Sequence, residues 1–255
     1  MKKIFAALLI SSLLSVNALA LDAVGIWLFD DEEEADVLKD RSEKGNHGKI
    51  FGAEWVEGKF GNALRFNGTG YVEVPISDSM KDFEREITFM AWIRPTQWPD
   101  WMKVAGMGNW TDPSPKPYQF MLGFADVPGD LKFYVGDTTV AAGAPVIELD
   151  IWQHVAGVSA AGERGELYVN GELVKQNPST PLLPTPEDIS LYIGAAFRRD
   201  ERTNFFVGDI DEAALFNTAL SADEVKLYMG GLKEIVQPVA PAGKLAASWG
   251  NIKGR

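Results

Sequence analysis

The sequence predicts an all-β fold in which two antiparallel sheets pack face to face as a sandwich, with one short helix near the C-terminus. Three observations predict it. Short β-favouring runs recur between Gly, Pro, Asn and Asp residues along most of the chain. Several of these runs alternate with a period of two, and only Ala222–Met229 has a convincing helical pattern. Closely spaced strands without intervening helices argue against a parallel sheet.

The expected strands can be read in order along the chain. They lie at Ala23–Phe29, Gly48–Phe51, Ala63–Phe66, Tyr71–Val74, Ile87–Ile93, Val104–Gly108, Tyr118–Phe124, Asp130–Val135, His154–Ser159, Glu166–Val169, Glu172–Gln176, Ser190–Ala195 and Gly208–Phe216. Ile87–Ile93 is largely apolar on both faces, which predicts an inner strand of one sheet.

Two local patterns predict a hairpin turn and the two ends of the helix. Asn170-Gly171 supplies two positive-φ positions between β-favouring runs, which predicts a type I′ hairpin turn. Ser221 and Glu224 form an S-x-x-E capping box at the start of the helix, and Gly230 follows its end. The expected strand Gly208–Phe216 is therefore followed, after a short connection, by the helix Ala222–Met229.

The first 20 residues resemble a secretory signal peptide, since lysines precede a short apolar run that ends in small residues. We expect cleavage after Ala20, a domain over residues 21–232 and a linker and tail over 233–255. The apolar run is too short to span a bilayer as a helix, so we expect a secreted or periplasmic protein without membrane insertion after cleavage. The net charge of −12 disfavours nucleic acid as a partner, and the chain has no cysteine.

Five segments between residues 24 and 228 occur in a recognisable order. They are Gly25–Asp30, Asp40–Gly48, Gly58–Gly68 with Tyr71–Pro75, Ile87–Pro95, and Trp152–Ala156 running on to Tyr168–Gly171. Ile210-Asp211-Glu212 and the Ala-Leu-Ser start of the helix close the series. Together they resemble the laminin-G-like, concanavalin A-like jelly-roll domains of bacterial extracytoplasmic proteins.

The resemblance implies that the first and last strands are neighbours. It also implies a module that binds carbohydrate or protein, frequently with calcium. We therefore expect a non-catalytic module that recognises carbohydrate or a glycoprotein. The alternative is a protein-interaction or adhesion module without a sugar site.

Calcium is the cofactor that the sequence suggests, because carboxylate and carbonyl oxygens at loop corners suit a hard cation. The resemblance points to Asp211 as a ligand, and we add Asp30, Asp40 and Asn46 from the neighbouring strand and the first loop. In the alternative interpretation, Asp211 accepts backbone hydrogen bonds and no metal binds.

A proline-rich segment between Arg94 and Phe120 is expected to be a loop that carries exposed aromatic rings, which suit stacking on sugars. Its candidates are Trp98, Trp101, Trp110 and Tyr118, with Asn109 as a polar neighbour. Alternatively, the tryptophans cover the end of a sheet as a minor core. Arg198 could bind an anionic sugar or instead pair with adjacent acids.

Catalysis is the competing class. Jelly-roll β-glucanases use a Glu-x-Asp-x-x-Glu strand, but the corresponding run here has Asp209 first and Ala214 last. The chain also lacks cysteine and a Gly-x-Ser-x-Gly motif. We therefore expect no enzymatic activity, and a glycoside hydrolase is the third choice.

Overall fold

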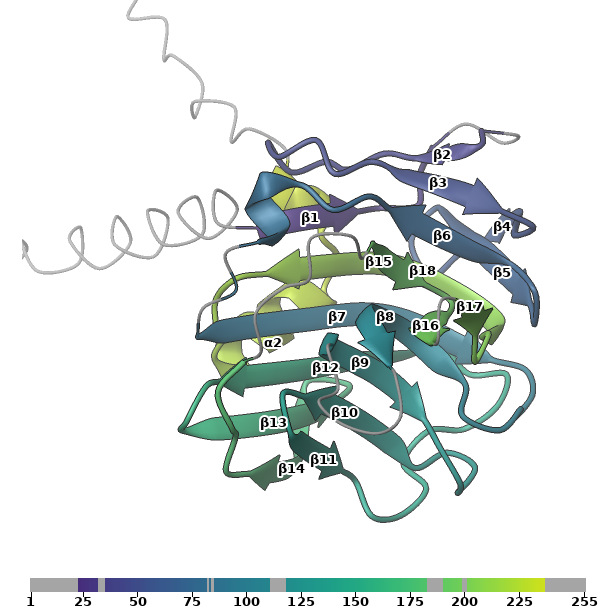
Figure 1. Ribbon diagram of the computed structural model, residues 1–255. Coiled ribbons are helices and arrows are strands. Elements are labelled where there is room, and N and C mark those ends of the chain that lie inside the picture. The colour runs from purple at the N-terminus through teal and green to yellow at the C-terminus, as the bar shows by residue number, and fades with distance from the viewer. Residues whose placement is uncertain are drawn as a thin grey trace, which may run out of the picture.

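The computed structural model describes residues 23–31, 35–81, 83, 85–110, 118–182, 190–198 and 201–236. The expected signal peptide and the chain beyond residue 236 lie outside this part. Within it, the strands form two sheets that overlap in the view of Figure 1, which confirms the predicted sandwich. No helix in the described ranges is both long and apolar enough to cross a membrane.

One sheet has eight strands among the described residues. Its order is β14 (Glu172–Asn177), β13 (Arg164–Val169), β12 (Gln153–Ala160), β7 (Glu86–Pro95), β18 (Val207–Phe216), β5 (Asn62–Asn67) and β4 (Glu54–Glu57), and β1 (Ala23–Trp27) also pairs with β18. The predicted inner strand, β7, lies between β12 and β18.

The other sheet has ten strands in the same part of the chain. Its order is β11 (Thr138–Ala141), β10 (Leu131–Val135), β9 (Tyr118–Phe124), β8 (Lys103–Trp110), β15 (Leu191–Ile193), β6 (Tyr71–Val74), β3 (Gly48–Phe51) and β2 (Val37–Leu38), with β16 (Ala196–Arg198) beside β8 and β17 (Glu201–Thr203) beside β16. All of these pairs are antiparallel except β16 with β8.

Strand β18 carries β7 along one side and two shorter strands, one after the other, along the opposite side. Val207–Ile210 pair with β5, and Ala213–Phe216 pair with β1. A β-bulge separates the two halves, and Glu212 within it has a φ of 50°. The first and last strands are therefore neighbours, as predicted.

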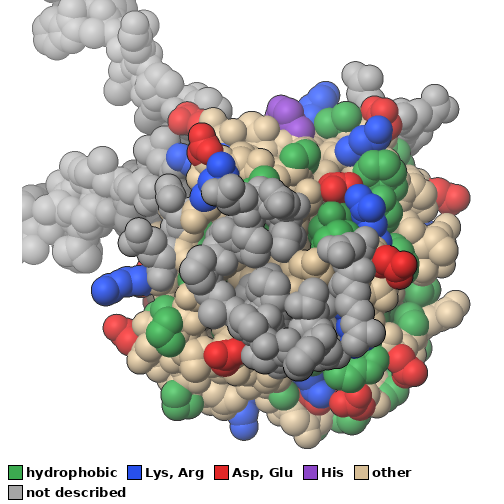
Figure 2. Space-filling model, viewed as in Figure 1, with side chains coloured by type: hydrophobic (Ala, Val, Ile, Leu, Met, Phe, Trp, Pro, Cys, Tyr) green, Lys and Arg blue, Asp and Glu red, His purple; other side chains and the backbone are tan. Residues whose placement is uncertain are grey.

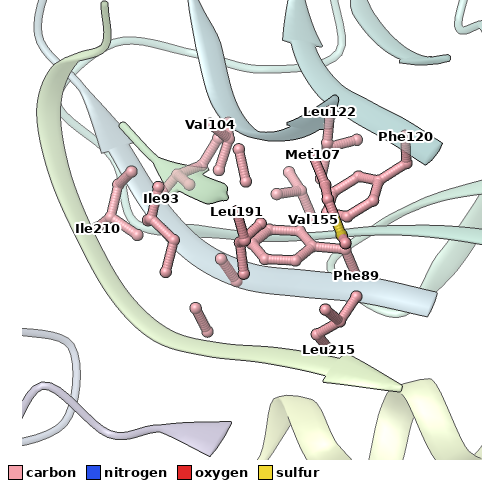
Figure 3. Close-up of a cluster of buried hydrophobic side chains, with 14 of the residues drawn as sticks. Phe89, Ile93, Val104, Met107, Phe120, Leu122, Val155, Leu191, Ile210 and Leu215 are labelled. Atoms are coloured by element: carbon pink, nitrogen blue, oxygen red, sulfur yellow. The ribbon is translucent and has the colours of Figure 1, made fainter. Parts of the chain in front are cut away.

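The main core lies between the two sheets, as Figure 3 shows. Phe89 of β7 stacks on Phe120 of β9 with ring centres 5.3 Å apart, so aromatic residues link the sheets directly. Burying each side chain of this size contributes about 1.5–3 kcal/mol. The core is thus the main source of stability in a chain that has no cysteine.

Helix α2 (Ala222–Met229) covers part of the outer face of the eight-stranded sheet. The Ser221 hydroxyl accepts from the Glu224 amide, and the Glu224 carboxylate accepts from the Ser221 amide, which confirms the capping box. Tyr228 stacks on Phe216 with ring centres 5.5 Å apart. After α2, α3 (Lys233–Val236) brings Val236 against the same apolar cluster, so packing continues past the predicted boundary at residue 232.

The sequence missed β2, β4, β11, β16 and β17, together with α3 and the 3₁₀ turn η1 (Asp78–Met80). Each of these elements has four residues or fewer, too short for periodicity to define. The predicted loop was wrong for Trp110, whose backbone ends β8, whereas Tyr118 begins β9 at the bound that the strand prediction Tyr118–Phe124 gave. The parallel contact with β16, which pairs Asn109 with Phe197 and Trp110 with Arg198, extends β8 past its predicted end at Gly108.

Candidate functional site

Aromatic rings form a ladder on the outer face of the ten-stranded sheet. The two valines of β6 point into the core, so Tyr71 points outward. Its ring stacks on Phe51 of β3 at 4.8 Å and lies 6.1 Å from Tyr192 of β15. Tyr192 stacks on Phe197 of β16 at 5.5 Å, and Phe205 lies 6.3 Å from Tyr71. We call these five residues the aromatic face.

Arg202 of β17 lies over this face. Its guanidinium carbon is 5.6–5.8 Å from the centres of three of the rings, and Nη2 donates to Glu73 at 3.1 Å. The hydroxyls of Tyr192 and Ser190 donate to the other oxygen of Glu73, each at 3.1 Å. Burial, followed by the charge of Glu73, raises the pKa of Tyr192, which remains a donor at neutral pH. The Glu73 carboxylate is therefore held by three donors.

Lys49 of β3 supplies a second cation. Its Nζ lies 5.2 Å from the centre of the Phe51 ring, and its backbone pairs with that of Glu73. In Figure 2, basic, acidic and hydrophobic side chains lie next to one another over the region where Figure 1 labels β6 and β17. Aromatic rings bordered by fixed donors and acceptors can contact both the C–H faces and the hydroxyls of a sugar.

The sequence analysis did not single out this face. Alternation in Tyr71–Val74 could have marked Tyr71 and Glu73 as outward-facing residues. It could not show that Phe51, Tyr192 and Phe197 would lie beside them. That arrangement depends on pairing between strands that are far apart in the sequence.

The six residues predicted to bind ligand lie at two ends of β8. Trp98 and Trp101 precede this strand, whereas Asn109 and Trp110 end it. Eight residues of extended strand span about 25 Å. The structure therefore does not bring these residues together in one compact site.

At the first end of β8, Trp98 packs against the core, with its ring edge-on to Phe124 at 5.0 Å. This contact corresponds to the alternative interpretation of a covered sheet end. The carbonyl of Trp101 accepts from Lys103 Nζ at 2.8 Å, and Lys103 also donates to the Phe124 carbonyl at 2.7 Å. Lys103 is completely buried, and burial lowers its pKa to about 7.

At the other end of β8, four of the predicted residues approach one another through the backbone. The parallel contact with β16 places Phe197 opposite Asn109 and Arg198 opposite Trp110. Tyr118 opens β9 beside the same end. Because Phe197 belongs to the aromatic face, this end of β8 borders that face.

Asp40 and Asn46, two of the predicted calcium ligands, belong to an internal hydrogen-bond network. The Asp40 carboxylate accepts from the backbone amides of Ile26, Ser42 and Asn46 at 2.7–2.9 Å. The Asn46 side chain donates to the Val24 carbonyl at 2.6 Å. These bonds fasten the loop that contains both residues to β1.

Asp30 and Asp211, the other two predicted calcium ligands, contact one turn, Gly58–Asn62, between β4 and β5. Asp211 Oδ2 accepts from two consecutive amides of the turn, both at 2.9 Å, and Asp30 Oδ1 accepts from the amide at its end at 3.1 Å. A Cβ at the first glycine of the turn would lie 2.7 Å from Asp211 Oδ2. The turn therefore closes tightly on both carboxylates.

The other oxygen of Asp211, Oδ1, is buried and has no hydrogen-bond partner among the described residues. Burial raises the pKa of Asp211 to about 8 and that of Glu212 to about 7, and neighbouring carboxylates add to both shifts. These features fit a cation. However, no three His, Cys, Asp or Glu side chains in the described ranges converge on a metal position. An ion at this turn would therefore depend largely on backbone carbonyls and water.

A cavity of about 570 Å³ opens beside the same turn, with Asp30, Phe60, Glu212 and Lys233 in its lining. Lys233 Nζ lies 3.5 Å from Asp30 Oδ2, and Glu212 accepts from the Leu232 amide. The sequence analysis had noted Glu212 only as part of a family-like run. Its positive φ depends on the bulge where β18 changes partners, which a local pattern does not reveal.

Two stacked antiparallel sheets with adjacent first and last strands define the class of jelly-roll β-sandwich domains. The chain belongs to the concanavalin A-like lectin/glucanases superfamily, whose family model matches residues 66–226. The fold is the jelly roll of that superfamily. Comparison with curated proteins gives no match.

Solved structures share the fold at low sequence identity. Domain 4 of AbnA, an extracellular arabinanase from Geobacillus stearothermophilus solved with arabinotriose, is 18% identical with a TM-score of 0.61, covering 85% of this chain and 98% of that one. The binding domain of Paraclostridial Mosquitocidal Protein 1 is 15% identical with a TM-score of 0.61, covering 83% and 52%. Trypanosoma rangeli sialidase in complex with sialic acid is 19% identical with a TM-score of 0.63, covering 91% and 40%. The chain thus spans about half of the toxin domain and two fifths of the sialidase.

Proposed function

We propose that this protein is a carbohydrate-binding module and that the aromatic face is its binding surface. The observation that carries the proposal is the ladder of rings from Phe51 to Phe197, bordered by the bonded pair Glu73 and Arg202. Rings on paired strands are held rigidly, so little conformational entropy is lost when a sugar stacks on them. The sugar can be free or part of a glycoprotein.

The solved relatives support carbohydrate as the ligand class to test first. One is an arabinanase domain in complex with arabinotriose, and another is a sialidase in complex with sialic acid. At this level of identity the likeness concerns the fold, so the particular sugar has to be found by experiment.

The proposal is for binding without catalysis. Asp209 and Asp211 are completely buried, and Asp209 is held by Arg65 and Arg94 at 2.6–3.1 Å. A glycosidase of this type needs a third acid where Ala214 stands. Incubation with mixed β-glucans should release no reducing ends, and a steady release would overturn this part of the proposal.

Calcium and export complete the proposal. Asp211 and Asp30 would hold a calcium ion that neutralises the buried carboxylates beside the turn and fastens the turn to β18. Asp40 and Asn46 would act instead by closing their loop. Export is supported by the position of β1, which begins at Ala23, three residues after the expected cleavage site. N-terminal sequencing of the protein recovered outside the cytoplasm would test that site.

The aromatic face can be tested with the full chain on a glycan array, followed by titration of the sugars that bind. Tyr71→Ala and Phe197→Ala should each weaken binding about tenfold, which corresponds to about 1.4 kcal/mol. Trp152→Ala is the matched control, because this partly buried aromatic residue packs against Arg94 of the other sheet. Loss of binding in the control alone would contradict the proposal. No binding to any glycan by the folded protein would favour the protein-interaction module instead.

A further inference from the structure

We propose that the aromatic face selects acidic carbohydrate, meaning oligosaccharides with carboxylate or sulfate groups, and that Lys49 and Arg202 determine this specificity. The inference rests on the proposed function and adds the class of ligand. It follows from the two cationic side chains that lie over the rings, not from the rings themselves.

A different cation lies over each end of the aromatic face, Lys49 over Phe51 and Arg202 over the end at Phe197. Lys49 Nζ lies 5.2 Å from the centre of the Phe51 ring, and the Arg202 guanidinium lies 5.6–5.8 Å from the centres of three other rings. The Lys49 side chain is exposed, and the Arg202 side chain is 39% exposed. A ligand approaching this face therefore meets positive charge before it meets the ring faces.

The acid among these cations is already bonded. Glu73 accepts from Ser190, Tyr192 and Arg202, and its side chain is 21% exposed. No carboxylate in the described part of the chain lies within ion-pair distance of Lys49, so its charge is available to a ligand. The Arg202 guanidinium uses one terminal nitrogen for Glu73, and its remaining donors can bind a second oxyanion in the forked geometry typical of arginine.

The charge of the whole protein acts in the opposite direction, since the net charge is −12. At physiological ionic strength the Debye length is about 8 Å, so exposed charges further away are largely screened. Lys49 and Arg202 lie within direct contact of a sugar on the aromatic face and are screened much less. Lys49 and Arg202 therefore determine the preference for acidic over neutral sugars, whereas acidic residues elsewhere on the protein lower the affinity for long polyanions.

The test is titration calorimetry of the full chain with chemically matched ligands. One pair is an oligogalacturonide and its carboxyl-reduced, neutral form, and the other is dextran sulfate and dextran. We expect each acidic member to bind at least tenfold more tightly than its neutral partner. Comparing the pairs then distinguishes carboxylate from sulfate as the preferred group.

Variants of the two cationic residues test whether they cause the preference for acidic carbohydrate. Lys49→Gln and Arg202→Gln should each reduce the preference for the acidic ligand at least threefold. Arg202→Lys should retain part of the preference, because lysine keeps the positive charge but lacks the forked hydrogen-bonding geometry of arginine. Lys175→Gln is the control, because it removes an exposed positive charge from β14, at an edge of the other sheet. Circular dichroism of each variant verifies folding, and Lys49→Gln leaves no buried partner unpaired.

The outcomes separate the two proposals. Equal binding of acidic and neutral members that depends on Tyr71 would overturn the acidic preference and leave the binding face in place. A preference that survives both Lys49→Gln and Arg202→Gln would also overturn the inference. If the folded protein binds none of these ligands or any other carbohydrate, the proposed function fails as well.

Discussion

The guanidinium of Arg202 lies 5.8 Å from the centre of the Tyr192 ring, and both side chains donate to the carboxylate of Glu73. The three residues come from β17, β15 and β6, so they fasten a hairpin and two neighbouring strands at one point. Because one acceptor serves both donors, the position of Arg202 and the ionisation of Tyr192 depend on the same charge.

Glu73→Gln should lower the pKa of Tyr192. Burial is the larger cause of its raised value, and the negative charge of Glu73 is the next, so the pKa should fall part of the way toward 10. NMR titration of tyrosines labelled at Cζ would measure the shift. Tyr168, whose pKa is raised to about 12 by burial and Glu166, is the internal control and should not move. An unchanged Tyr192 would show that the hydroxyl does not sense Glu73.

Lys103→Met should remove a rise in stability at alkaline pH. Burial lowers the pKa of Lys103 from 10.5 to about 7, so between these values the unfolded chain holds a proton that the folded chain has released. Raising the pH through this window therefore stabilises the folded state, by up to about 1.4 kcal/mol per pH unit.

Urea unfolding of wild type and Lys103→Met across that window would measure the difference. The variant loses two hydrogen bonds to backbone carbonyls, so its absolute stability also changes. Only the difference in slope tests the prediction, and parallel curves would contradict it.

His154→Phe should make the protein more resistant to acid. Burial lowers the pKa of His154 from 6.5 to about 3, and its Nδ1 has no hydrogen-bond partner in the described part of the chain. As pH falls from 6.5 to 3, His154 becomes protonated in the unfolded chain but stays neutral in the folded chain. The free energy of unfolding therefore decreases across this window. A phenylalanine can keep the edge-on contact with Trp92, at 5.6 Å, without titrating.

Thermal unfolding of both proteins at several pH values between about 3 and 7 would check this. The wild-type midpoint should fall more steeply than that of His154→Phe. Equal slopes would mean that other groups dominate acid unfolding.

Local patterns were sufficient for much of the fold. Asn170 and Gly171 have φ of 50° and 75°, as the predicted type I′ turn requires, since their residue types tolerate that conformation. The capping box at Ser221 and the bounds of α2 also agree with the prediction. The resemblance to jelly-roll domains implied that β1 and β18 are neighbours, and this pairing suits two apolar strands that shield each other's edges.

The candidate site was less predictable because it depends on strand pairing over long distances in the sequence. Aromatic residues in a proline-rich segment drew attention to Trp98, which packs against the core, and to Trp101, whose carbonyl accepts a hydrogen bond from a buried lysine. Tyr71 and Tyr192 gave no stronger local signal than many strand residues. They form a face only because β6 and β15 pair.

Calcium should stabilise the protein through Asp211 and not through Asp40. Asp211 Oδ1 is buried without a partner in the described ranges, whereas the Asp40 carboxylate already accepts from three backbone amides. Binding to the folded state alone adds about 2.7 kcal/mol at one hundred times the Kd, so millimolar calcium added to chelator-treated protein should raise Tm measurably. Asp211→Asn should abolish this increase. Asp40→Asn should lower Tm in the absence of calcium and retain the increase, because its role is to hold the loop against β1. The same calcium response in both variants would place the ion elsewhere, and no response in the wild type would remove calcium from the proposal.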